Sequence, residues 1–363
     1  MEMNYASPLL LMIFSLAMFT SYVVEAKVPA IFILGDSTAD VGTNNYLPAS
    51  GARADFPHNG IDFPHSRSTG RFSNGFNSAD FLAKLMGFKR SPNPFFLLLN
   101  QKSSIKRPSF RGVNFASGGS GLLDLTGQNN QQMVIPLSEQ IAQFATIYNN
   151  LTAVKGAEVT KQFLSESLFS ISVGSNDIFG YFYSNTTITE QEFIAILMNT
   201  YERYIRALYN LGARKFGIIS VPPIGCCPSQ RVFNATGGCL ENINEAARAF
   251  HSALDTLLSK LSSDLQDMKY SLGNTYKMTI DVIDNPLPNN FKDVQSACCG
   301  SGRLNAEVGC LPDANLCANR NEYLFWDLYH PTQAASRLAA LTLYHGTPEY
   351  VAPINFAQLA DDY

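Results

Sequence analysis

Strand-length apolar runs alternate with longer helical patterns along most of the chain, and this alternation limits the fold more than any other feature. The apolar runs are residues 30–34, 112–117, 167–174, 215–222 and 278–284. Because polar residues seldom interrupt them, they are typical of strands buried on both faces of a parallel sheet. We therefore predict an α/β protein with a parallel central sheet of about five strands.

The segments between these runs carry the signals of helices. They are residues 77–87, 136–151, 189–212, 241–268 and 331–346. In the third segment, Thr189 and Glu192 have the spacing of a capping box, and Gly212 stands where helices commonly end. Helices that connect parallel strands imply right-handed crossovers and a doubly wound domain. We place this single domain at residues 27–363.

The residues that follow the apolar runs are candidates for chemistry, because the crevice of a doubly wound sheet lies outside the carboxyl ends of its strands. Ser37 follows the first run in the tripeptide Gly35-Asp36-Ser37, Gly118 follows the second run, and Asn176 follows the third. Gly, Asp and Ser are also ordinary turn residues, so the tripeptide by itself fits a simple turn. The alternative is a nucleophilic Ser37 at the end of a buried strand.

A serine nucleophile needs a general base and a group that orients the base. His330 suits the first role, because it precedes a Pro-led helix and Asp327 stands three residues before it. An aspartate so placed can hold one imidazole nitrogen and leave the other facing Ser37. Both residues are also common polar residues at helix entries. The other histidines are His58 and His65 in a Pro- and Gly-rich loop, His251 inside a helix and His345 at a helix end.

Acyl transfer to a serine also requires hydrogen-bond donors for the developing oxyanion. The candidates are the N–H of Ser37, the N–H of Gly118 and the side-chain amide of Asn176. Glycine permits close approach of a backbone N–H to a ligand. Gly118 fits a plain turn equally well, and Asn176 fits an Asx-turn. Serine chemistry of this kind needs no metal or cofactor, and we expect none.

The composition and the N-terminus bear on partners and location. A formal net charge of −4 argues against a nucleic-acid partner. Residues 8–24 carry no charge, and Val24-Glu25-Ala26 offers small residues at the positions that a signal peptidase reads. We predict a signal peptide at residues 1–26 and a secreted mature chain without a transmembrane span. The alternative is a membrane anchor, but a span needs about 20 apolar residues.

The cysteines and the glycosylation sequons agree with export. All seven cysteines follow Gly225: Cys226, Cys227, Cys239, Cys298, Cys299, Cys310 and Cys317. Their close spacing in loop-like sequence favours short-range disulfides, whereas a zinc site would need Cys-x-x-Cys pairs or neighbouring histidines. Cys226 or Cys227 is expected to pair with Cys239, and the odd number leaves one free thiol. Asn150, Asn185 and Asn234 begin the acceptor sequons for glycosylation.

Four segments, "FILGDSTADVGTNN", "GVNFASGGSG", "VGSND" and "FWDLYHPT", follow one another over nearly all of the predicted mature chain. They resemble the four sequence blocks of the GDSL esterase/lipase family, a branch of the SGNH hydrolases. "GIDFPHSRSTGRFSNG" and "NRNEYLFWDLYHP" are most similar to the plant-type secreted branch. The resemblance implies a three-layer flavodoxin-like fold and an extracellular location, in the cell wall or apoplast. It also implies Ser37 as nucleophile, His330 as base with Asp327 as its partner, and Gly118 and Asn176 as oxyanion donors.

Two positions depart from the family pattern. Thr38 stands where the family name has leucine, and Cys227 follows Cys226 where the family usually shows one cysteine, which makes Cys227 the candidate for the free thiol. We predict a secreted carboxylic ester hydrolase that acts on a small-molecule, lipid or polymer ester through an acyl-enzyme. Two alternatives stay open. One is an acyltransferase at the same site, similar to a cutin synthase, and the other is a non-catalytic secreted glycoprotein that binds lipid or carbohydrate.

Overall fold

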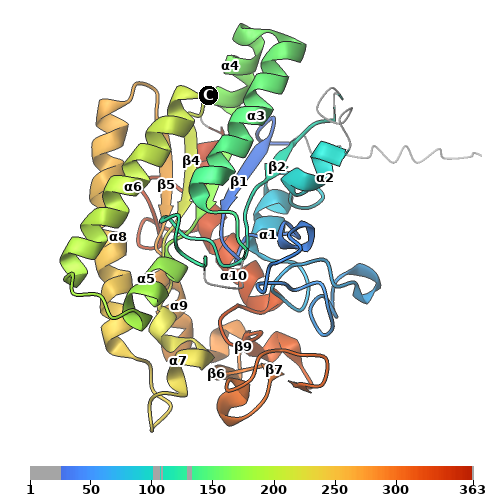
Figure 1. The fold of residues 1–363 in the computed structure, drawn as a ribbon, viewed down its shortest axis with the longest axis vertical. Coiled ribbons are helices and arrows are strands. Elements are labelled where there is room, and N and C mark those ends of the chain that lie inside the picture. The colour runs from blue at the N-terminus through green and yellow to red at the C-terminus, as the bar shows by residue number, and fades with distance from the viewer. Residues whose placement is uncertain (1–25, 101–106, 108, 129–132, 362–363) are drawn as a thin grey trace, which may run out of the picture.

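A computed structural model describes residues 26–100, 107, 109–128 and 133–361 of the chain (Figure 1). The predicted signal peptide lies outside these residues except for Ala26. Within the described part of the chain, no helix is long and apolar enough to cross a membrane.

A six-stranded sheet forms the centre of the molecule, in the order β10-β5-β4-β3-β1-β2. The strands are β1 (Ile31–Gly35), β2 (Gly112–Asn114), β3 (Leu168–Ser172), β4 (Lys215–Ile219), β5 (Lys269–Gly273) and β10 (Val351–Ala352). All neighbours pair in parallel except the short edge strand β10, which runs antiparallel to β5. The predicted α/β class with a mostly parallel sheet is confirmed.

The expectation of a strand at residues 278–284 was wrong, because this segment belongs to the helix α9 (Thr275–Asp284). Asn274 caps the helix by accepting a hydrogen bond from the Lys277 N–H at 3.0 Å. Met278 and Val282 are buried one helical turn apart, so the apolar residues of the segment have helical spacing. The fifth parallel strand is instead β5, whose sequence "KYSLG" has too few apolar residues to stand out.

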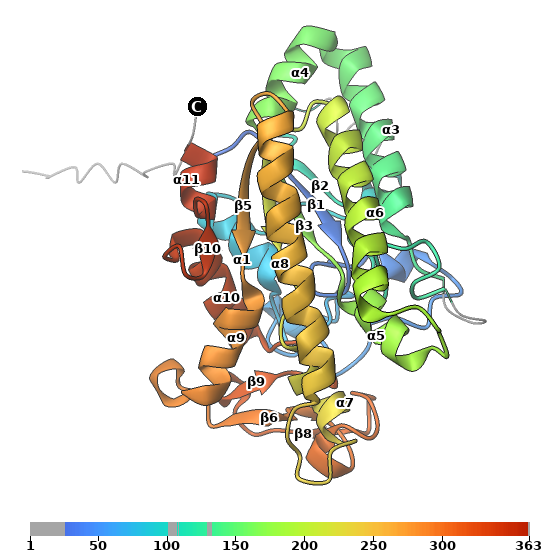
Figure 2. The same ribbon diagram turned by 90° about the vertical axis from the view of Figure 1, so that its left-hand side faces the viewer.

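Helices cover both faces of the sheet and make it the middle of three layers (Figure 2). On one face lie α3 (Leu137–Lys155), α6 (Glu190–Asn210) and α8 (Glu241–Asp264), and on the other lie α1 (Ser78–Leu85), α10 (Gln333–His345) and α11 (Phe356–Asp361). A hydrophobic core lies on each face of the sheet, and alternate residues of β1 pack into each: Phe32 into the first core and Ile33 into the second. Helix α6 begins with the predicted capping box of Thr189 and Glu192. Helix α10 begins after Thr332, which caps it, rather than at residue 331. The remaining helices are α2 (Phe95–Asn100), α4 (Ala157–Glu166), α5 (Ser175–Tyr183) and α7 (Pro228–Arg231).

A disulfide-bonded segment below the carboxyl edge of the sheet contains four short strands (Figure 1). They are β6 (Asp293–Ala297), β7 (Cys299–Gly300), β8 (Asn315–Leu316) and β9 (Tyr323–Phe325). The disulfides join Cys298 to Cys317, Cys299 to Cys310 and, outside this segment, Cys226 to Cys239. Short-range pairing is confirmed, and the buried Cys227 is the free cysteine. Within the described residues no group of His, Cys, Asp or Glu is arranged to hold a metal ion.

The three predicted glycosylation sites differ in their surroundings. Asn150 on α3 and Asn185 in the loop after α5 are exposed. Asn234 is half-buried, and its side-chain oxygen accepts hydrogen bonds from the backbone N–H and the hydroxyl of Thr236. An oligosaccharide would therefore meet least obstruction at Asn150 and Asn185, and glycosylation itself stays a prediction.

Candidate active site

The turn after β1 places Ser37 at the carboxyl edge of the sheet. Gly35 ends the strand with a φ of +144°, and a Cβ at this position would lie 2.1 Å from the carbonyl oxygen of Ser172 on β3. Only glycine avoids that overlap. The Gly35 carbonyl accepts hydrogen bonds from Ser120 and Gln140 at 2.8 and 2.9 Å. These contacts hold the backbone directly before the candidate nucleophile.

Ser37, His330 and Asp327 lie in one hydrogen-bonded row. The Nε2 atom of His330 is 2.7 Å from the Oγ atom of Ser37. Its Nδ1 atom is 2.8 Å from each carboxylate oxygen of Asp327. Asp327 Oδ1 also accepts the backbone N–H groups of Tyr329 and His330 at 2.9 Å, which fixes the turn between β9 and α10. The row has the geometry of a nucleophile, a general base and a group that orients the base.

Burial and neighbouring charges shift the pKa values of Asp327 and His330. Burial of Asp327 acts to raise its pKa, but the adjacent His330 and the hydrogen bonds outweigh burial, and the pKa stays below its usual value. Burial of His330 acts to lower its pKa, but the carboxylates of Asp327 and Asp36 outweigh it, and the pKa is raised above 6.5. An ionised Asp327 next to a basic imidazole favours proton transfer from Ser37 to His330.

The two neighbouring glycines of the second sequence block, Gly118 and Gly119, have different surroundings. The N–H of Gly118 donates to Asp40 Oδ2 at 2.9 Å, so it is engaged inside the protein. Gly119 lines the cavity over Ser37 instead. Asn176 also lines this cavity, and its amide donates to the carbonyl of Ser120 at 2.9 Å. An amide nitrogen carries a second N–H, which this bond leaves available.

Two buried aspartates, Asp40 and Asp177, hold the loops around Ser37 and are not among the residues that line the cavity. Asp40 accepts the N–H groups of Gly42 and Thr43, in addition to that of Gly118. Asp177 accepts two N–H groups of the loop after β2 and the hydroxyl of Thr126. Burial raises the pKa of each carboxyl group to about 6. These contacts give both aspartates the role of loop anchors.

Thr38, the departure from the family name, forms polar contacts beside the nucleophile. Its hydroxyl donates to Asp36 Oδ1 at 2.8 Å and lies 3.0 Å from the Ser172 hydroxyl. A leucine side chain could make neither contact. The backbone next to Ser37 is therefore held by more polar contacts than a leucine at this position would allow.

A cavity of about 850 Å³ opens over the hydrogen-bonded row and is lined by Ser37, Asn176 and His330. Its size lies within the usual range for small-molecule sites. Phe72, from the Pro- and Gly-rich loop, lines it and stacks obliquely on His330 with 4.9 Å between ring centres. Further lining residues on this side are Phe179, Gly180, Tyr183, Cys227 and Tyr329. Burial raises the pKa of the Cys227 thiol to about 12, so the thiol is neutral.

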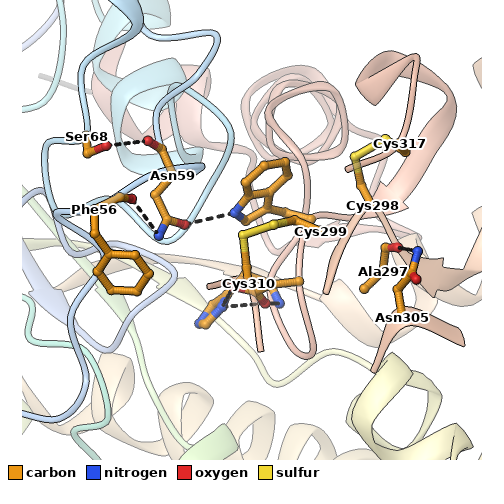
Figure 3. The surroundings of a disulfide bond; sticks show 12 residues. Phe56, Asn59, Ser68, Ala297, Cys298, Cys299, Asn305, Cys310 and Cys317 are labelled. Atoms are coloured by element: carbon orange, nitrogen blue, oxygen red, sulfur yellow. Dashed lines mark hydrogen bonds and ion pairs between the residues drawn. A yellow bond between two sulfur atoms is a disulfide. The ribbon is translucent and has the colours of Figure 1, made fainter. Parts of the chain in front are cut away.

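His58 and His65 do not line this cavity, and neither do His251 and His345. Sequence reasoning missed one supporting contact, made by Asn59, whose side chain Figure 3 shows near the disulfides. Trp326 is fully buried, and its indole N–H donates to Asn59 Oδ1 at 2.9 Å. It thereby ties the loop that carries Phe72 to the turn that carries Asp327. Trp326 is the single tryptophan of the chain and directly precedes Asp327, and this was the available signal.

Comparisons with known proteins identify the family of the chain. The family model of the GDSL-like lipase/acylhydrolases matches residues 31–343. The chain is 39% identical to GDSL esterase/lipase At5g55050 of Arabidopsis thaliana, covering 92% of this chain and 90% of that protein. It is 35% identical to GDSL esterase/lipase At1g71250, with the same coverage of both chains. GDSL esterase/lipase 6 of the same plant is 36% identical and covers 95% of both chains. The chain therefore belongs to the GDSL-like lipase/acylhydrolase family and is a carboxylic ester hydrolase.

Proposed function

We propose that the protein hydrolyses carboxylic esters in two steps through an acyl-enzyme on Ser37. The observation that carries this proposal is the continuous row from Ser37 Oγ through the His330 imidazole to Asp327, with separations of 2.7 and 2.8 Å. Nucleophilic serine sites are recognised by this mutual geometry rather than by sequence position.

In the first step, Ser37 Oγ attacks the ester carbonyl carbon while His330 Nε2 takes the hydroxyl proton. Asp327 stabilises the imidazolium that forms. The backbone N–H of Ser37 and the second amide N–H of Asn176 serve as donors for the oxyanion. Because Asp40 engages the N–H of Gly118, we assign the third donor to Gly119 in place of the Gly118 expected from sequence.

The tetrahedral intermediate then collapses, and the bond between the carbonyl carbon and the alcohol oxygen breaks. His330 returns its proton to the departing alcohol. A water molecule next attacks the acyl-enzyme, again giving its proton to His330, and the acid leaves as Ser37 regains a proton. Each chemical step uses side chains that line the cavity or contact such a side chain.

The test is hydrolysis of p-nitrophenyl butyrate by the wild-type protein and by Ser37→Ala. We expect hydrolysis and fluorophosphonate labelling at Ser37 in the wild type, and loss of both in the variant. The matched control is Ser259→Ala, at an exposed position on α8. Turnover that survives in pure Ser37→Ala would refute the assignment.

We further propose that the mature protein is secreted. Three disulfides among the described residues and the exposed sequon residues Asn150 and Asn185 support an oxidising, glycosylating route. Expression in plant cells should yield extracellular protein that begins near Lys27 and shrinks on deglycosylation. A protein that stays inside the cell and still carries residues 1–26 would contradict the proposal.

A further inference from the structure

The cavity over Ser37 continues along the carboxyl edge of the sheet. Its lining includes Ser172 at the end of β3 and Ser220 directly after β4, and it reaches α9 and α10. The part between β4, α9 and α10 is here called the hydroxyl-lined end, because its lining includes Ser220, Thr275, Thr279, Ser336 and Thr342. Hydroxyl side chains thus come to one part of the cavity from three elements that are far apart in sequence.

Two of these hydroxyls are buried without a hydrogen-bond partner. Ser220 is 3% exposed and Ser336 is 1% exposed, and in the described part of the chain neither Oγ atom has a partner. The hydroxyls of Thr275 and Thr342, in contrast, donate to the carbonyl oxygens of Ser220 and Leu338. A buried hydroxyl without a partner has a free-energy cost, and a ligand that supplies the partner removes this cost.

The chemistry of the missing partner is that of another hydroxyl. A serine hydroxyl rotates to suit its neighbour and is both a donor and an acceptor, so a ligand hydroxyl can complement it in either direction. A hydrocarbon group in the same place would leave both serine hydroxyls unpaired. Ser220 and Ser336 belong to different elements, so a ligand with several hydroxyls is suited to bind both. Met278 and Leu338 also line this end and offer apolar surface to the C–H groups of such a ligand.

The charges of the hydroxyl-lined end favour a neutral ligand. Among the described residues that line it, the charged one is Asp281. Its carboxylate pairs with Lys277 and accepts the Tyr350 hydroxyl at 2.8 Å, so it is already compensated. Because no lysine or arginine of the described chain lines this end, an anionic group buried there would have no counter-charge.

We propose that the hydroxyl-lined end binds a neutral polyhydroxylated group of the ester substrate, of the size of a sugar ring, and that Ser220 and Ser336 select for its hydroxyls. The inference rests on the proposed function, because it takes Ser37 as the reacting group. It assigns to the substrate a carbohydrate-like alcohol or acid in place of a plain alkyl one. The cavity of about 850 Å³ has room for such a ring beside the ester group.

Two pairs of esters test this assignment, one for each side of the ester bond. Glucose 6-acetate and cyclohexylmethyl acetate both carry acetate on a CH₂ group next to a six-membered ring, with and without ring hydroxyls. Methyl quinate and methyl cyclohexanecarboxylate form the same comparison on the acid side. After division by the rate constant of alkaline hydrolysis, the wild-type kcat/KM should favour the hydroxylated ester at least about tenfold in one pair. A tenfold preference corresponds to about 1.4 kcal/mol, the usual size of one hydrogen bond. The pair that shows it identifies the side of the ester.

Ser220→Ala and Ser336→Ala each remove one hydroxyl oxygen from the wall. Each should lower the preference for the hydroxylated ester about five- to tenfold, the loss expected for one hydrogen bond, and this ratio does not depend on the fraction of active enzyme. Ser271→Ala is the matched control, because Ser271 on β5 is also buried with an unpaired hydroxyl but does not line the cavity. It should keep the wild-type preference. None of the three variants should lower the thermal stability, since each removes an unpaired buried hydroxyl.

The outcomes separate this inference from the proposed function. Ester hydrolysis without a preference in either pair would overturn the inference and leave the esterase intact. The same holds if Ser220→Ala and Ser336→Ala both keep the wild-type preference, or if Ser271→Ala lowers it equally. A wild-type protein that hydrolyses no ester and resists fluorophosphonate would overturn the proposed function and this inference together.

Discussion

The Nε2 atom of His330 lies 2.7 Å from the Oγ atom of Ser37, although 293 positions separate the two residues in sequence. Ser37 reaches this place from the end of β1, and His330 from the turn before α10. The turn is held by Asp327, which contacts both the His330 ring and the N–H groups of the turn. A local aspartate thus orients the His330 ring toward a distant serine.

Replacing Asp327 with asparagine should lower kcat on the order of 10⁴-fold, because the imidazole would lose the carboxylate that fixes its tautomer and stabilises its charge. Steady-state kinetics with p-nitrophenyl butyrate measure this loss. Asp313→Asn, at an exposed aspartate in the same disulfide-bonded segment, should keep wild-type kinetics. A loss below tenfold in Asp327→Asn would show that the carboxylate does not orient the base.

The pH dependence should follow His330, which must be neutral to accept the Ser37 proton. Burial acts to lower its pKa, but Asp327 and Asp36 raise it above 6.5. Because activity requires the deprotonated ring, kcat/KM should rise with pH through a midpoint above 6.5. Asp36→Asn removes one of the two charges that stabilise the imidazolium, so the midpoint should move to lower pH. A midpoint that stays in place or moves upward would contradict this coupling.

Asn176→Ala should lower kcat about 10²- to 10³-fold, because it removes an oxyanion donor that acts mainly in the transition state. KM should change much less than kcat. The control Asn149→Ala changes an exposed asparagine on α3 and should have no effect. Equal losses in kcat and in substrate affinity would point instead to a general disturbance of the site.

The adjacent cysteines should differ in their effect on stability. Cys226→Ala breaks the disulfide to Cys239 and should cost about 2–4 kcal/mol of unfolding free energy. Cys227→Ala changes a buried free cysteine of nearly the same volume and should cost about 1 kcal/mol. Denaturant unfolding under non-reducing conditions compares the two. Equal losses would indicate that the pairing in solution differs from that in the structure.

Local patterns were sufficient for most of the secondary structure. Continuous apolar runs predicted β1, β3 and β4, because a strand buried on both faces needs apolar side chains at successive positions. The same reasoning failed at residues 278–284, where a short apolar segment fits a helix as well as a strand. β5 was not predicted because its sequence contains few apolar residues. Its pairing with β4 and β10 places it in the sheet.

For the candidate site, too, the sequence supplied one part of the description and the tertiary structure supplied the other. The sequence blocks that resemble the GDSL family proposed Ser37, Asp327, His330 and Asn176 as the candidates, because the residue types and spacing alone fitted turns and helix entries equally well. The folded chain was needed to engage the N–H of Gly118 with Asp40, to pair Cys226 rather than Cys227, and to bring α9 and α10 to the cavity over Ser37. The first and the last depend on contacts between segments far apart in sequence, which leave no periodic trace in either segment. The disulfide is local, but two adjacent cysteines stand at nearly the same separation from Cys239, so spacing could not choose between them.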